Sequence, residues 1–287
     1  MNLELEKETL RCCRCVYAGE HAQDEAVEAV ISDAMPDAAE IVEAQARLFL
    51  RSKESRAGRV QLRFAIEGSL LYRSEEEGRI CALELKGDCP VDWEDEAMEE
   101  DVRLLVTGRL YRVEGRMINP RKLQLRCELI ASVREWAETE IAVSTGCSAE
   151  KLELKIEKRI WPYVSAVGEK TFVLSEDLSF SEGAEELSAL LLTGLELQTE
   201  ESQIVAGKLL LRGEARLSLL YLNGAPAAPQ SLKLPWSQLL DMGQECERCH
   251  VFLMPTALYA DPFSDGQGVS VELHLTAQAV CFSETAF

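Results

Sequence analysis

Apolar and polar residues alternate along most of the chain, and this alternation predicts strands. A period of two places every second side chain on one face of a sheet, so each such segment buries one face and exposes the other. Charged or glycine-containing stretches separate the segments, as is typical of hairpin connections. The pattern predicts an antiparallel meander in the first half of the chain. Its strands are expected at residues 43–52, 59–74, 79–87, 101–113 and 122–133.

The second half of the chain repeats this pattern. Residues 58–72, GRVQLRFAIEGSLLY, align without a gap with residues 207–221, GKLLLRGEARLSLLY, and the same offset places the LEL of residues 152–154 on that of residues 3–5. A repeat of domain size indicates two tandem copies of one domain rather than a solenoid of small units. The strands of the second copy are expected at residues 194–202, 207–222, 230–236, 250–260 and 268–282.

A meander with one buried face has to close on a second sheet or on itself. We therefore predict an all-β protein of two tandem, similar antiparallel β-sandwich or open-barrel domains, residues 1–147 and 148–287. Tyr72 and Tyr221 are expected at equivalent strand ends, with their rings on the core and their hydroxyls near the surface. Residues 20–35, EHAQDEAVEAVISDAM, fit a short helix or an acidic connector, and the sequence does not decide between them.

Composition narrows the classes of partner. Of 287 residues, 47% are apolar and 28% charged, which is the balance of a folded protein. The formal net charge of -20 repels phosphate backbones and anionic lipids, and no basic patch opposes it, so we expect neither nucleic-acid binding nor membrane insertion. The charged amino terminus differs from a signal peptide and predicts a cytoplasmic protein, in which the ten cysteines are reduced.

Cys246, Cys249 and His250, in the sequence CERCH, form the strongest candidate for a chemical site. The spacing matches c-type haem attachment, which takes place outside the cytoplasm, and two of its thiols could bind zinc with partners elsewhere. The interpretation that we favour is a loop-to-strand junction with reduced thiols. The thiols of CCRC, residues 12–15, could join Cys246 and Cys249 in a zinc site only if the amino-terminal segment crossed to the second domain.

The other candidates are weaker. The acidic stretches EDEAMEED, residues 94–101, and DPFSDGQG, residues 261–268, lack the spaced oxygen ligands of a calcium loop. His21, His250 and His274 are too scattered to place a base beside a nucleophile, and His274 has the position of a sheet-face residue. The sequence contains no GxSxG, phosphate loop or dinucleotide fingerprint. We therefore predict no enzyme activity, no cofactor, and no catalytic or metal site.

Several short motifs resemble the SPOCS domain of clostridial spore coat assembly proteins. The second copy keeps Gly207, Leu220-Tyr221 and an LPW at Leu234, whereas SDGQG replaces its last-strand turn. The family often ends in a LysM module, and this chain stops after the second copy. The matching features of the first copy are Pro36-Asp37, Ile41-Val42, Gly58, Leu71-Tyr72 and Asn119-Pro120-Arg121-Lys122.

The resemblance implies a role in a sporulating bacterium. We expect a non-enzymatic interaction or scaffold protein in spore coat assembly, located in the mother-cell cytoplasm at the forespore surface. Its partner would be another protein, such as a spore coat morphogenetic protein. The alternative is a metal- or ligand-binding module that uses Cys246, Cys249 and His250.

Overall fold

The computed structural model describes residues 4–75, 78–148, 157, 159–181, 186–222 and 227–286. These residues form strands joined by turns, and no helix occurs among them, so the predicted all-β fold class is confirmed. The strands are β1 (Glu4–Val30), β2 (Ala38–Arg56), β3 (Arg59–Ser74), β4 (Ile80–Glu94), β5 (Arg103–Asn119), β6 (Lys122–Ser148), β7 (Ile160–Ser179), β8 (Ala189–Val205), β9 (Lys208–Leu222), β10 (Ala227–Asp241), β11 (Arg248–Pro262) and β12 (Gly268–Ala286).

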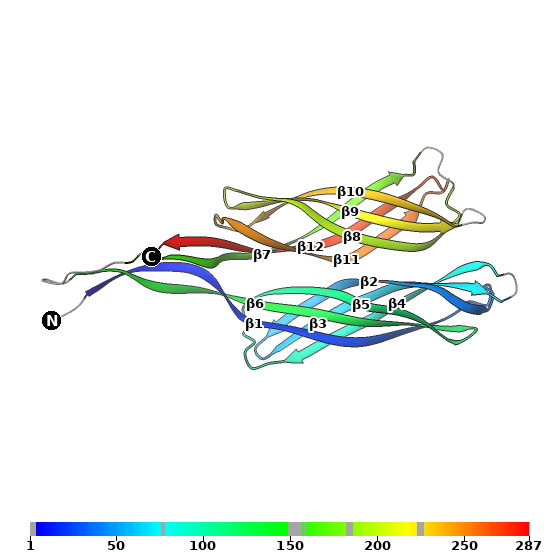
Figure 1. Cartoon of the computed structure of the whole chain (residues 1–287), viewed down its shortest axis with the longest axis horizontal. Helices are drawn as coiled ribbons and strands as arrows, with labels where there is room; N and C mark the ends of the chain where they lie inside the picture. The colour runs from blue at the N-terminus through cyan, green and yellow to red at the C-terminus, as the bar shows by residue number, and fades with distance from the viewer. Residues whose placement is uncertain are drawn as a thin grey trace.

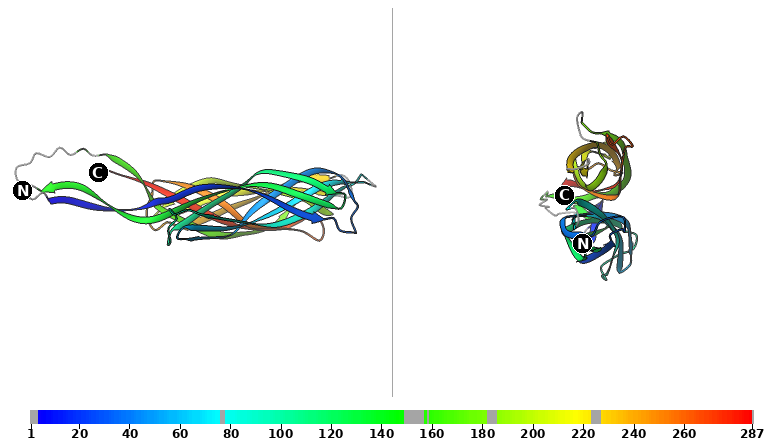
Figure 2. Two further views of the ribbon diagram at one scale, coloured as in Figure 1. Left: turned by 90° about the horizontal axis from the view of Figure 1, so that it is seen from below. Right: turned by 90° about the vertical axis from the view of Figure 1, so that its right-hand side faces the viewer.

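Three antiparallel sheets make up two lobes (Figure 1). One sheet has six strands in the order β11-β12-β7-β1-β6-β5, and the others have the orders β2-β3-β4 and β10-β9-β8. In the first lobe β1, β6 and β5 pack on β2 to β4, and in the second β7, β12 and β11 pack on β8 to β10. Viewed end-on, the lobes lie side by side (Figure 2). Strand pairing thus follows the same order in both lobes, while their superposition as copies of one domain stays a prediction.

Strand β1 includes most of the acidic stretch of residues 20–35, for which the sequence left helix and connector open. Residues 20–30 are neither helix nor connector: they belong to β1 and pair with β6, from Glu20 opposite Ser132 to Val30 opposite Lys122. From residue 21 to residue 30, half-buried and exposed positions alternate strictly. The ladder with β6 outweighs the helix propensity of the alanines and glutamates, because sheet stability depends on tertiary context. The predicted boundary at residues 147 and 148 falls at the end of β6.

Each lobe buries the apolar face that the alternation predicts. Tyr72 in β3 and Tyr221 in β9 are both 1% exposed and belong to the cores of their lobes. The Tyr72 hydroxyl donates a hydrogen bond to the Pro36 carbonyl at 3.3 Å, and the ring of Tyr221 stacks on Phe180 at 5.3 Å. The predicted placement of both rings on the core is therefore confirmed, while the placement of the two hydroxyls near the surface stays a prediction.

Two of the motifs that carry the family resemblance, Pro36-Asp37 and the turn with Arg121, meet at one end of the first lobe. Arg121, in the turn before β6, donates to Asp37 Oδ1 at 2.8 Å and to Asp33 Oδ1 at 2.9 Å. It also donates to the carbonyls of Met35 at 2.8 Å and Ile31 at 3.0 Å. The guanidinium thus fastens the connection between β1 and β2, so these residues maintain the fold.

The two lobes share a buried interface that the alternation does not show. The outward face of β12 is exposed at Ser270 and Glu272, but Thr276, Gln278 and Val280 on the same face are buried. This part of β12 lies against the first lobe. Side chains also cross between the cores, since Phe49 belongs to the second core and Met254 to the first.

Gln278 makes the central polar contact of this interface. Its side-chain oxygen accepts the backbone N–H of Val106 at 2.7 Å, and its amide donates to the carbonyl of the same residue at 2.7 Å. Gln278 and Val106 are both 0% exposed. The side chain therefore supplies the edge of β5 with the two hydrogen bonds that a neighbouring strand would otherwise make. The Lys53 ammonium donates nearby to the Leu104 carbonyl and to Glu169.

Candidate functional site: an open-edged ribbon and the cleft at its base

A two-stranded ribbon projects from the lobes toward the amino terminus (Figure 1). It consists of residues 4–12 of β1 paired with residues 139–148 of β6, from Glu4 opposite Ser148 to Cys12 opposite Thr139. The ladder between β5 and β6 ends at the pair of Arg103 and Trp136. These ribbon segments of β1 and β6 pair only with each other among the described residues, so both outer edges of the ribbon lack a ladder partner.

Unpaired strand edges are surfaces that can form hydrogen bonds with other chains. Each presents a row of backbone N–H and C=O groups that can pair with a strand from another chain. In the lobes, by contrast, side chains cover several strand edges, as Gln278 covers β5. Within the ribbon, the exposed ion pair between Arg11 Nε and Glu140 Oε1, at 3.0 Å, adds little stability because solvent screens it. The backbone ladder is therefore what holds the ribbon together.

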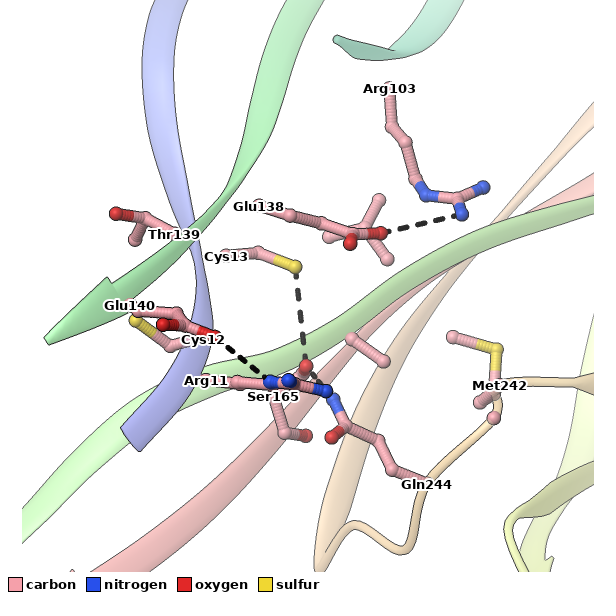
Figure 3. Close-up of a pocket in the computed structure, with 13 residues that line it drawn as sticks. Arg11, Cys12, Cys13, Arg103, Glu138, Thr139, Glu140, Ser165, Met242 and Gln244 are labelled. Carbon is pink, nitrogen blue, oxygen red and sulfur yellow. Dashed lines mark hydrogen bonds and ion pairs between the residues drawn. The ribbon is translucent and has the colours of Figure 1, made fainter. Parts of the chain in front are cut away.

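A cleft of about 630 Å³ lies at the base of the ribbon, where β1 meets β7 (Figure 3). These two strands form a single ladder pair, Cys13 with Val164. On one wall Arg103 faces Glu138 at 3.5 Å. On the other, the Ser165 carbonyl accepts from the Gln244 amide and from the Cys13 thiol, whose sulfur lies 4.0 Å away. Beside the one ladder pair between β1 and β7, β7 is therefore held by side-chain hydrogen bonds to its backbone.

The thiols of this cleft are poor nucleophiles. Burial raises the pKa of Cys12 above its ordinary value, and burial followed by the charge of Glu138 raises the pKa of Cys13. A raised pKa keeps a thiol protonated at neutral pH, whereas the thiolate is the reactive form. The cleft is lined by paired charges and backbone polar groups.

Cys246 precedes β11, and Cys249 and His250, which are consecutive residues of that strand, point to opposite faces of the sheet. The imidazole of His250 is exposed and lies against Phe282, with ring centres 5.1 Å apart. Cys249 pairs across the ladder with Cys281, and the thiols of Cys246 and Cys281 share a hydrogen bond. Burial raises the pKa of Cys246 and of Cys281. These contacts match a junction of loop and strand with reduced thiols.

The amino-terminal cysteines do cross toward the second lobe, through the pair of Cys13 and Val164. Cys12 is buried and Cys15 is exposed, so the two face different surroundings. Within the part of the chain that the structure describes, no group of three or more His, Cys, Asp or Glu side chains could hold a metal ion. The amino-terminal segment therefore does reach the second lobe, as a zinc site shared with Cys246 and Cys249 would require. The described side chains nevertheless form no four-thiolate site there.

The remaining candidates have structural contacts. His21 stacks on Trp93 at 5.5 Å, and His274 lies on the sheet face beside Glu272, at 2.6 Å. In the acidic stretch after β4, Met98 is buried in the first core, and its carbonyl accepts from the Gly58 N–H at 3.1 Å. In residues 261–268 the N–H of Phe263 donates to the Gly268 carbonyl at 2.9 Å, closing a turn.

The sequence did not predict the ribbon, because the length of the ribbon depends on how two segments far apart in the chain pair with each other. The only signal in the sequence was the repeated LEL, and residues 3 and 152–154 lie outside the described residues. The described residues contain no helix with the length and apolarity that crossing a bilayer requires. Comparison with protein families, curated proteins and solved structures gave no match.

Proposed function

We propose that this chain is a non-enzymatic scaffold that binds protein partners by adding a strand to its ribbon. The observation that carries the proposal is the pair of outer edges, on residues 4–12 and 139–148, that have no ladder partner among the described residues. Main-chain hydrogen bonds to an added strand supply affinity, and neighbouring side chains supply specificity. The outer part of the ribbon extends beyond the bodies of both lobes, while the ends of β7 and β12 lie beside its base, and the outer part gives an extended partner access (Figure 2).

The biological process in this proposal comes from the SPOCS-like motifs. They support a role in spore coat assembly, with a coat morphogenetic protein as partner and the mother-cell side of the forespore surface as location. The ion pair of Asp37 and Arg121, at 2.8 Å, is consistent with motifs that maintain a fold and leave binding to other surfaces. The ribbon is such a surface.

A fluorescent fusion in sporulating cells tests the proposal. We expect the wild-type fusion to gather around the forespore and deletion of the gene to disturb coat placement without affecting vegetative growth. Ile141→Asp, which puts a charge on a 46% exposed ribbon position, should disperse the fusion. Leu239→Asp is the matched control, because Leu239 is 44% exposed on β10 and far from the ribbon in sequence.

Two outcomes contradict the proposal. Diffuse wild-type fluorescence throughout sporulation, with normal coats in the deletion strain, would remove the coat role. Equal localisation of the wild type and Ile141→Asp would remove the ribbon as the docking element.

A further inference from the structure

The two edges of the ribbon differ sharply in charge. On β1, residues 4–11 read ELEKETLR and carry five charged side chains. On β6, residues 141–148 read IAVSTGCS and carry none, and they contain no proline. Charged residues, proline and β-bulges are the usual means by which proteins protect an edge strand from pairing. The β1 edge is therefore protected by charge, whereas the β6 segment carries a bulge at Thr145, between the pairs Glu6–Gly146 and Lys7–Ser144, and is otherwise open to another strand.

We propose that residues 141–148 of β6 pair with the same residues of a second copy of this chain. The proposal rests on the ribbon being the docking element of the preceding section, and it gives the β6 edge to a second copy, while the coat protein of that section would dock on the assembled ribbon. An antiparallel arrangement about a two-fold axis brings one segment against itself, and such an interface is closed. The product is a four-stranded ribbon in the order β1-β6-β6′-β1′, in which only the charged β1 edges remain outside.

Charge favours a second copy over a foreign strand at this edge. A chain with a net charge of -20 attracts basic partners, but residues 141–148 offer them no carboxylate. The same lack of charge lets two identical segments pair without placing like charges opposite each other, which would be destabilising. The repulsion between the two copies comes from the rest of each chain, and salt screens it.

The side chains of the segment favour the same arrangement. Ile141 and Val143 are two residues apart and so lie on one face, with Leu10 of β1 directly opposite Ile141. Ile141 is exposed, and Val143 and Leu10 are only half-buried. A second copy places its own Ile141 and Val143 on this face and extends the apolar strip, and Ile, Val and Thr are strong strand formers.

Sedimentation velocity of the purified full chain, with a reducing agent present, tests the pairing. We expect a monomer–dimer equilibrium whose dissociation constant falls as NaCl is raised, because salt weakens the repulsion between acidic copies. Ile141→Lys replaces an apolar side chain of this segment with a charged one, the device by which edge strands are kept from pairing, and should raise the dissociation constant by about tenfold or more. Thr9→Lys is the matched control: it adds the same charge to the β1 edge of the ribbon and should leave the dimer intact.

A chain that stays monomeric at every concentration and salt would overturn self-pairing. So would a dimer that Ile141→Lys leaves unchanged, or that Thr9→Lys weakens equally. Circular dichroism of each variant checks that the strands are retained. If the purified chain is monomeric while its fusion still needs Ile141 for localisation, the ribbon binds a foreign strand, and self-pairing fails while the proposed function stands.

Discussion

Replacing Gln278 with leucine should weaken the interface between the two lobes. The change keeps a side chain of similar size but removes both hydrogen bonds to Val106, each 2.7 Å long. The N–H and the carbonyl of Val106 would then lie buried without a partner. Water cannot easily replace the lost groups, because Gln278 and Val106 are both 0% exposed.

The expected loss follows from the cost of an unpaired backbone group. A buried donor or acceptor left without a partner costs about 1–3 kcal/mol, so two such groups cost about 2–6 kcal/mol. The Lys53 ammonium, 3.5 Å from Gln278 Oε1, keeps its contacts with Leu104 and Glu169 and limits further loss. A domain has a total stability of about 5–15 kcal/mol, so the change in free energy of unfolding is a large fraction of the whole.

Equilibrium unfolding in urea measures this loss. Tryptophan fluorescence, to which Trp136 beside the interface cluster of Leu105, Val167 and Val280 contributes together with the other three tryptophans, should change at a lower urea concentration in the variant. Gln198→Leu is the control, because Gln198 is exposed on β8 and its side-chain amide donates to Glu196 at 2.9 Å, so its change should stay within about 0.5 kcal/mol. An equally small effect of Gln278→Leu would refute the role assigned to the Val106 contacts.

Three further predictions concern the first lobe. Met98→Ala removes a buried side chain from its core and should cost about 2–5 kcal/mol in urea unfolding; a loss below about 1 kcal/mol would show that Met98 does not fill the core. Burial raises the pKa of Cys89 to about 12 and of Cys127 to about 11, so the folded chain retains protons that the unfolded chain releases above about pH 9. The free energy of unfolding should therefore fall between about pH 9 and pH 11, less steeply in Cys127→Val, and a stability independent of pH in this range would contradict the assignment. At pH 8, iodoacetamide should modify the exposed Cys15 before Cys89 and Cys127, as peptide mapping can measure, and equal rates in the folded protein would contradict the burial.

The alternation of residues determined the class of fold and most of its core. Leu62 and Leu211, at matching positions of the two repeated segments, are both buried in β3 and β9, and Tyr72 and Tyr221 follow them into the two cores. This part could be predicted because a period of two is a local property of a strand, and the face it buries in one sheet is the same wherever that sheet packs.

The tertiary structure decided which strands gained a second buried face and which kept a free edge. Thr276, Gln278 and Val280 read as the solvent face of a strand, and only the neighbouring lobe buries them. Residues 20–30 read as helix or connector, and only the ladder with β6 makes them a strand. The open edge at residues 141–148 likewise depends on where the ladders with β5 and β1 end. Each outcome depends on contacts between segments far apart in the chain. The secondary-structure propensity of the residues and the period of their apolar positions are local properties and do not predict such contacts.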